Sequence, residues 1–170
     1  MRHLAVRVTW IVVFAAAMGW LEGVVVVYIR ALLGFAKGDA SPGADEMVRA
    51  LHSLPWLVTT EQTREAATLI MLVALAALAG RTLRSRFGAF LTAFGVWDIT
   101  YYIALYVLVG WPPSLNTRDL LFLLPEHPLW VQPVWVPVVI SSVMVVGGIA
   151  LQVDPRAPGP DGLPRRVREG

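Results

Sequence analysis

The sequence contains no cysteine. This absence excludes disulfide bonds, zinc sites built from thiolates, cysteine-ligated iron–sulfur clusters, c-type haem attachment and cysteine nucleophiles. Without cysteine, the sequence gives no indication of whether the protein's compartment is oxidising or reducing.

Charged residues are scarce as well. They make up 15% of the 170 residues, whereas a soluble chain carries about 25%. Hydrophobic residues reach 56% and the mean hydropathy is +0.63, which excludes a water-soluble globule and general disorder. The isoelectric point near 9.4 does not indicate a nucleic-acid partner, because the basic residues adjoin apolar runs. We therefore predict an integral membrane protein whose surroundings are the lipid bilayer.

Four apolar stretches are long enough to cross a bilayer, which takes about 20 residues in a helix. They lie at about 8–29, 60–80, 87–109 and 131–151. Thr59 and Gln62 fit a capping box that would start the second span near Thr60, and Pro133 or Pro137 suits the first turn of the fourth. The expected fold is an all-α bundle of four transmembrane helices.

The chain divides into a transmembrane domain, residues 1–152, and a tail at 153–170 that is rich in Pro, Gly and Arg. We expect this tail to be disordered, basic and cytoplasmic. Within the domain, the segment around Met47 and Leu51 has apolar residues at helical spacing and predicts a short interfacial helix. The apolar run at 120–124 is too short to span, so it should dip into the interface or pack on the helix ends.

Lys and Arg are distributed unevenly about the four spans, and the short loop at 81–86 gives the strongest bias. This pattern predicts cytoplasmic N- and C-termini in a bacterial-type plasma (inner) membrane. The first span has an alternative interpretation as a cleaved export signal, because Arg2 and Arg7 precede it and Ala15 to Ala17 offer a cleavage site. Against cleavage, the apolar run continues well beyond those alanines. The basic residues expected inside are Arg2, Arg7, Arg81, Arg84, Arg86, Arg156, Arg165, Arg166 and Arg168, and those expected outside are Arg30, Lys37, Arg49, Arg64 and Arg118.

Counting about 1.5 Å of helical rise per residue places the polar residues of the spans at a similar depth, in the outer half of the bundle. They should face the interior, because a charge facing lipid costs about 2.5 to 3.5 kcal/mol on insertion scales. Four acids and a single intramembrane arginine leave three options: protonated carboxylates, a bound cation or cationic ligand, or water at Glu61. The candidate ligand-binding residues are Glu22, Glu61, Arg64, Glu65, Asp98, Tyr101 and Tyr102.

Purely structural interpretations compete with this site. Glu61, Arg64 and Glu65 could be acids and a partner at a helix start, where they complement the helix dipole. Asp98 and Glu22 could be a buried hydrogen-bonded pair, joined by Arg64 or Tyr102, that fixes the register of the helices.

A divalent metal site is a further alternative, with carboxylates and an imidazole as ligands. It has weak support, because the sequence contains no HExxH motif and no closely spaced histidines. No other cofactor is indicated. The ligands of such a site would be Glu22, Glu65, Asp98 and His127.

The sequence contains no P-loop, dinucleotide-binding, nucleophile-elbow or EF-hand motif, so no catalytic residue is assigned. The leading hypothesis is a small membrane protein whose outward-opening pocket binds a cation, a proton or a small polar or lipid ligand, with the 110–130 connection as its lid. Acid–base catalysis by a carboxylate would be a stronger version. The alternative is a non-catalytic accessory or assembly subunit, held in a homo- or hetero-oligomer through the GxxxG face of Gly19 and Gly23.

Overall fold

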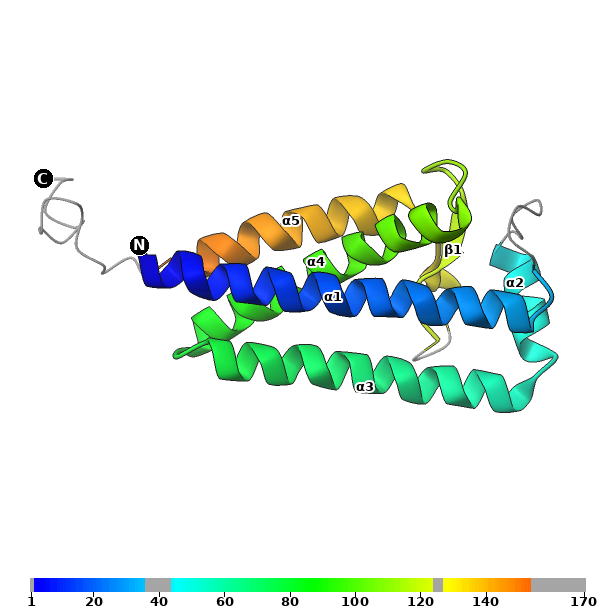
Figure 1. Cartoon of the computed structure of the whole chain (residues 1–170), viewed down its shortest axis with the longest axis horizontal. Coiled ribbons are helices and arrows are strands. Elements are labelled where there is room, and N and C mark those ends of the chain that lie inside the picture. Colours follow the sequence, from blue (N-terminus) through cyan, green and yellow to red (C-terminus); the bar gives the residue numbers. More distant parts are fainter. Residues whose placement is uncertain (1, 36–43, 124–126, 154–170) are drawn as a thin grey trace, which may run out of the picture.

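The structure, a computed structural model, describes residues 2–35, 44–123 and 127–153 (Figure 1). Its long helices lie along the long axis of the molecule and are long and apolar enough to cross a membrane, in agreement with the expected four spans. The short helix α2 (Ala44–His52) precedes the second of them. The four long helices are α1 (Arg2–Leu32), α3 (Pro55–Ala79), α4 (Leu83–Val109) and α5 (Trp135–Gln152).

The helix boundaries correct the predicted starts. Helix α3 begins at Pro55, where proline occupies the first turn without losing a hydrogen bond, and the expected capping box at Thr59 is wrong. The Thr59 and Thr60 hydroxyls instead donate to carbonyl oxygens one turn earlier, at 3.3 and 2.8 Å. Helix α4 begins before Phe87, because the Thr82 hydroxyl accepts the backbone N–H of Ser85 at 3.2 Å.

A small antiparallel ribbon joins α4 to α5, and the sequence did not indicate it. Strand β1 (Arg118–Leu120) pairs with β2 (Val131–Pro133), and the 3-10 turn η1 (Pro128–Trp130) lies between them. Strands of three residues are too short to display an alternating pattern. The ribbon also takes residues 131–133 out of the predicted fourth span, although Pro137 does lie in the first turn of α5.

Residues 121–123, the described part of the apolar run that follows β1, enter the bundle. The Phe122 ring lies 6.3 Å from Phe94 and 5.4 Å from Trp130, between ring centroids, and Leu123 is buried beside Leu57 and Leu51. The segment therefore packs against the inner sides of the helices. The expected position of this segment in the membrane interface stays a prediction, as does that of α2.

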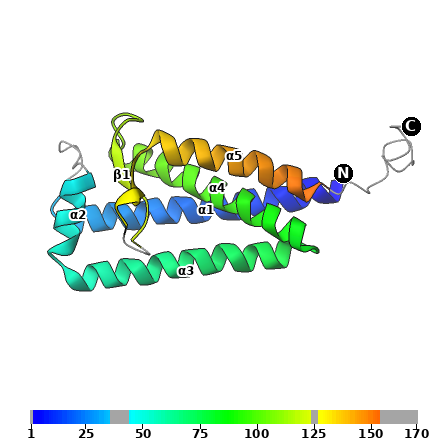
Figure 2. The same cartoon turned by 180° about the vertical axis from the view of Figure 1, so that it is seen from behind.

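Helix α4 packs against α1, α3 and α5, and Figures 1 and 2 show it crossing between α3 and α5. Glycines permit this close packing. A Cβ added at Gly19 would lie 2.3 Å from the Trp97 carbonyl oxygen, and one at Gly23 would lie 2.6 Å from the Ala104 Cβ. The face expected to join a second chain is thus filled by α4 of the same chain.

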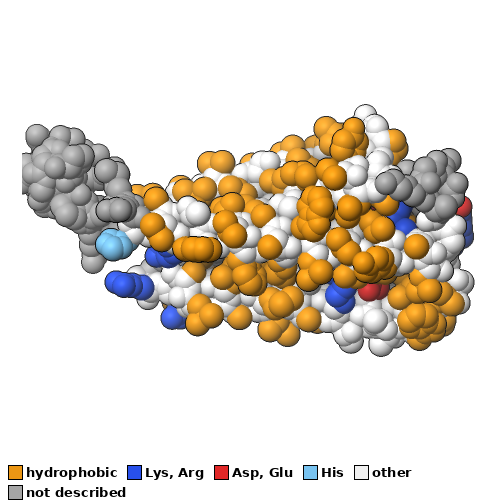
Figure 3. Space-filling view, in the orientation of Figure 1, with side chains coloured by type: hydrophobic (Ala, Val, Ile, Leu, Met, Phe, Trp, Pro, Cys, Tyr) orange, Lys and Arg blue, Asp and Glu red, His pale blue; other side chains and the backbone are white. Residues whose placement is uncertain are grey.

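The outer surface of the helices is largely hydrophobic. On the face shown in Figure 3, basic side chains lie at both ends, and acidic side chains lie only at the end away from the start of α1. Leu78, Leu83 and Val146 are among the most exposed apolar residues, at 88, 84 and 71%. The start of α1 and the end of α5 lie at the same end of the bundle, where the Arg7 guanidinium donates to the Gln152 carbonyl oxygen at 3.3 Å. The tail beyond residue 153 and the linker at 36–43 lie outside the described residues.

Candidate functional site

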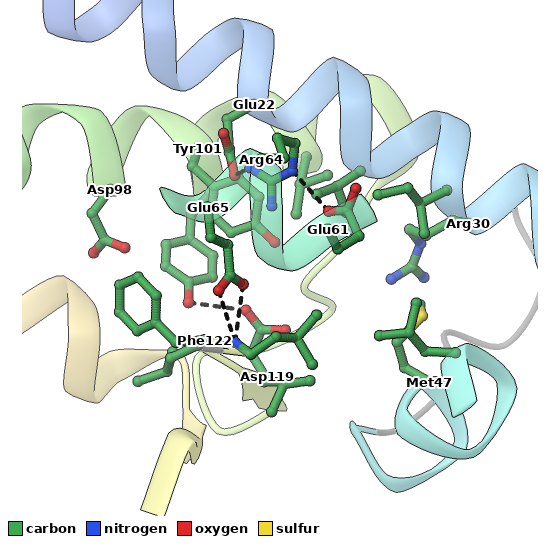
Figure 4. A pocket seen from close by; sticks show the side chains of 18 of the residues that line it. Glu22, Arg30, Met47, Glu61, Arg64, Glu65, Asp98, Tyr101, Asp119 and Phe122 are labelled. Carbon is green, nitrogen blue, oxygen red and sulfur yellow. Dashed lines mark hydrogen bonds and ion pairs between the residues drawn. The ribbon is translucent and has the colours of Figure 1, made fainter. Parts of the chain in front are cut away.

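A cavity of about 120 Å³ lies in the half of the bundle that carries α2 and the ribbon (Figure 4). A buried water needs about 10 to 15 Å³ on this measure, so the cavity holds roughly ten waters or a small organic molecule. Its walls come from α1, α2, α3, α4, Trp111 and residues 118–123. All seven candidate residues line it: Glu22, Glu61, Arg64, Glu65, Asp98, Tyr101 and Tyr102.

Arg64 joins two carboxylates on one wall of the pocket. Its Nε donates to Glu61 Oε2 at 2.7 Å, and its Nη1 forms an ion pair with Glu22 across from α1 to α3. The Thr68 hydroxyl also donates to Glu22, at 3.5 Å. Glu61 lies well inside α3, whose first turn holds no acid, so the expected position at a helix start is wrong, whereas the expected pairing of Arg64 with one of the acids is formed. The three charged groups satisfy one another and keep a formal charge of −1.

Asp98 has a different partner from the expected ones. Its Oδ2 accepts the hydroxyl of Ser141, on α5, at 2.7 Å, and Ser141 is buried. The predicted pairing of Asp98 with Glu22 through Arg64 or Tyr102 is not formed. The neighbouring Ser142 hydroxyl donates instead to the Val138 carbonyl oxygen, at 2.7 Å, as serines inside helices commonly do.

Asp119 in β1 is a pocket residue that sequence reasoning missed. Its carboxylate accepts the Tyr102 hydroxyl at 3.0 Å. Burial raises the pKa of Asp119 to about 7, and the charge of Asp98 adds to this, while bonds from Tyr102 and the Leu120 backbone oppose it. The available signal was an acid directly before an apolar run, but that segment was expected to lie outside the bundle.

Glu65 and Gln62 hold the 118–123 segment against α3. Both carboxylate oxygens of Glu65 lie 3.0 Å from the backbone nitrogen of Leu123, and the Gln62 amide donates to the Leu123 carbonyl oxygen at 3.3 Å. These bonds satisfy backbone groups that would otherwise be buried without partners. The segment is therefore a fixed wall of the pocket, and Gln62 has this role in place of the expected helix cap.

The charge balance of the pocket differs from the sequence count. Arg30, expected only as a marker of orientation, lies 5.4 Å above the centroid of the Trp111 ring and lines the cavity, as does the exposed Arg118. With Asp119 included, five carboxylates and three arginines line the pocket, a formal charge of −2. Figure 4 shows Asp98 and Arg30 at opposite ends of the site, with Glu65 and Asp119 between them.

Two indole groups in the wall have unused donors. Trp97 and Trp111 are only 7 and 3% exposed, and within the described part of the chain their Nε1–H groups have no acceptor. A buried donor without an acceptor costs about 1 to 3 kcal/mol. The pocket therefore contains both uncompensated negative charge and spare hydrogen-bond donors.

The residues suggested for a metal site are only partly brought together. His127 does not line the cavity, and its ring Nδ1 accepts the backbone N–H of Leu129 at 3.2 Å. Among residues 2–35, 44–123 and 127–153, no three His, Asp or Glu side chains are grouped to hold a metal ion. Glu22, Glu65 and Asp98 each face a separate hydrogen-bond donor.

The character of the pocket thus comes from its own residues: paired charges on one wall, two acids bonded to neutral hydroxyls, and buried indoles. Comparisons of the chain with protein-family models, with curated proteins and with solved structures find no match.

Proposed function

We propose that this chain is an integral membrane protein whose buried polar pocket binds a small polar ligand. The observation that carries the proposal is the concentration of charged side chains around one cavity, inside a bundle with an apolar exterior. Ionisable groups at membrane depth are costly, and their concentration around a cavity is typical of a functional site.

The proposed setting is a bacterial-type inner membrane with both termini in the cytoplasm. The start of α1 and the short connection between α3 and α4 lie at the same end of the bundle (Figure 1), and the arginines of these two segments support this orientation through the positive-inside rule. The pocket, at the other end, then opens to the outer side. Retention of the first span is also part of the proposal, because Ile11 and Ala15 of α1 belong to the hydrophobic core and would be lost by cleavage after Ala17.

Catalysis would extend this proposal. Asp119 is the group that favours it, since a carboxyl with a pKa of about 7 can take up or give up a proton near neutral pH. Asp98, which faces the same cavity, would be the second carboxyl. Binding of the ligand is the part that the pocket supports directly.

The second candidate is a non-catalytic accessory subunit of a larger membrane complex. The cluster of Arg64 with Glu22 and Glu61 favours it, because these bonds link α1 to α3 and would serve to hold the bundle together without any ligand. In this reading the partner would bind elsewhere than the Gly19 and Gly23 face.

Purification of the full chain in mild detergent, followed by native mass spectrometry and elemental analysis, tests the two candidates. We expect a small molecule or lipid to be retained by the wild type and by Glu46→Gln, which changes an exposed carboxylate on α2. Asp98→Asn should remain folded and lose the retained molecule. If Asp98→Asn instead keeps it and changes only detergent stability or a co-purifying subunit, the accessory reading replaces the pocket proposal.

A further inference from the structure

We propose that the ligand is a small organic ammonium ion that also carries an oxygen acceptor, which is the chemistry of an amino alcohol. The inference rests on the proposed function and names the class of ligand for the same pocket. An amino alcohol can reach the pocket as a free molecule or as the headgroup of a phospholipid.

The missing charge in the pocket is positive. Arg64 is fully used by Glu22 and Glu61, which leaves that group at −1. Asp98 and Asp119 accept hydrogen bonds from the neutral hydroxyls of Ser141 and Tyr102, and neither forms an ion pair with a basic residue in the described segments. A cation bound between them would supply the charge that the protein itself does not.

Aromatic rings complete the environment that an ammonium ion prefers. Five aromatic residues line the cavity, and a cation near such ring faces gains about 0.5 to 2 kcal/mol. Tyr101 and Tyr102 meet edge to face with centroids 4.9 Å apart, and the Tyr102 ring stacks with Trp111 at 6.3 Å. At the far end of the site a protein cation, Arg30, already lies over Trp111. The aromatic lining residues are Trp97, Tyr101, Tyr102, Trp111 and Phe122.

The two unpaired indoles of the cavity wall favour a ligand that also carries an acceptor. A plain alkylammonium ion has only donors and would leave the N–H groups of Trp97 and Trp111 unsatisfied. A hydroxyl or phosphate-ester oxygen on the same molecule can accept from them. Positive charge and an oxygen within a few bonds of each other together define the amino alcohol class.

A small metal ion fits these observations less well. A divalent cation needs several oxygen ligands converging on one point, whereas the pocket acids are dispersed and each already holds a donor. An ammonium ion has a diffuse charge and accepts ring faces together with carboxylates at longer range. The cavity of about 120 Å³ also accommodates several non-hydrogen atoms.

A panel of matched small molecules tests the inference on the full chain in detergent, by thermal shift and calorimetry. Ethanolamine and choline carry both features, ethylamine lacks the oxygen, ethylene glycol lacks the charge, and MgCl₂ represents the metal alone. We expect ethanolamine or choline to bind at least tenfold more tightly than ethylamine, with no response to ethylene glycol or Mg²⁺. Nanodiscs of phosphatidylethanolamine and of phosphatidylglycerol form the lipid arm, and stabilisation by the former only identifies the headgroup as the source.

The variant Trp97→Phe separates the two parts of the inference, because it keeps an aromatic ring and removes one N–H. Ethanolamine affinity should fall towards that of ethylamine, while ethylamine affinity stays the same. Asp98→Asn should weaken every ammonium compound at least tenfold, and Glu46→Gln none.

Three results would contradict the inference. Equal affinities for ethanolamine and ethylamine would contradict the part of the inference that gives the ligand an oxygen acceptor. Binding of Mg²⁺ or ethylene glycol without any ammonium compound would overturn the ligand class and leave a binding pocket in place. An absence of any response, from protein that also carries no retained molecule, would overturn the proposed function itself.

Discussion

Arg64 serves two carboxylates at once, which suits a planar guanidinium better than an ammonium group. Replacement by alanine would leave Glu22 and Glu61 buried without their cation. Breaking a buried ion pair in this way typically costs about 3 to 5 kcal/mol. We expect Arg64→Ala to lower thermal stability in detergent strongly and Arg64→Lys to lower it less.

The exposed Arg84 supplies the control for this experiment, since Arg84→Ala should leave the melting temperature nearly unchanged. If Arg64→Ala has the same melting temperature as the wild type, the link between α1 and α3 does not stabilise the bundle.

Asp119 should make stability depend on pH. Burial raises its pKa from the ordinary 3.8 to about 7, so between these values the folded chain holds a proton that the unfolded chain has released. Stability from this group is therefore greatest at low pH and is lost as the pH rises through 7. Asp119→Asn keeps an acceptor for Tyr102 without the charge, and we expect it to melt a few degrees higher than the wild type at pH 8, with the difference shrinking towards pH 5.

The comparison of wild type with Asp119→Asn at each pH isolates the effect of the Asp119 carboxyl and its coupling to neighbouring charges, because both proteins share the other titrating groups of the cavity. A melting difference that does not vary between pH 5 and pH 8 would show that Asp119 does not titrate in this range. The other charged lining groups are Glu22, Arg30, Glu61, Arg64, Glu65, Asp98 and Arg118.

At the scale of the secondary-structure elements, glycines set how closely α4 approaches α5. A Cβ added at Gly148 would lie 2.6 Å from the Gly88 carbonyl oxygen and 2.6 Å from Thr92 Oγ1, whereas one at Gly147 meets nothing within 4 Å. Overpacking of this kind costs about 1 to 3 kcal/mol. We expect Gly148→Ala to destabilise the protein and the adjacent Gly147→Ala to leave it as stable as the wild type, by thermal unfolding monitored in parallel. Equal melting temperatures for the two variants would contradict the tight contact between the helices.

The elements were predictable where a long pattern defines them. Hydropathy over about 20 residues located all four long helices, because length and apolar composition decide such segments. Their ends were less predictable. The start of α3 depends on Pro55 rather than on Thr59, and the ribbon of β1 and β2 depends on pairing between residues distant in sequence.

The same distinction applies to the site. Counting depth along each span predicted that seven pocket residues lie at a similar level, because the rise of a helix is regular. Partner choice was beyond that reasoning: Ser141 rather than Arg64 bonds Asp98, and Asp119 bonds Tyr102. Arg30 was assigned to orientation, and only tertiary packing places it over Trp111 at the pocket.

At the scale of the whole molecule, the absence of native cysteine permits a direct test of orientation. Leu83→Cys lies at the exposed start of α4, and Asn116→Cys lies in the exposed loop before β1. If the termini are cytoplasmic, a membrane-impermeant maleimide should label the Asn116→Cys variant and not the Leu83→Cys variant. The cells used have a permeabilised outer membrane and an intact inner membrane. Both sites should be labelled after the membrane is opened. Labelling of Leu83→Cys alone in intact cells would reverse the orientation and make the pocket open inwards.

The polar groups of α1, α3 and α4 find many of their partners in parts of the chain that are synthesised later. Glu65 meets the Leu123 backbone and Asp98 meets Ser141 only once the ribbon and α5 have followed. With the proposed membrane topology, a nascent chain that has inserted its first three spans would hold acids in the membrane without these donors. Pairing of these acids would then be a late event in biogenesis, and a chain interrupted before α5 would leave Asp98 without its Ser141 donor, an unsatisfied intermediate that cellular quality control can recognise.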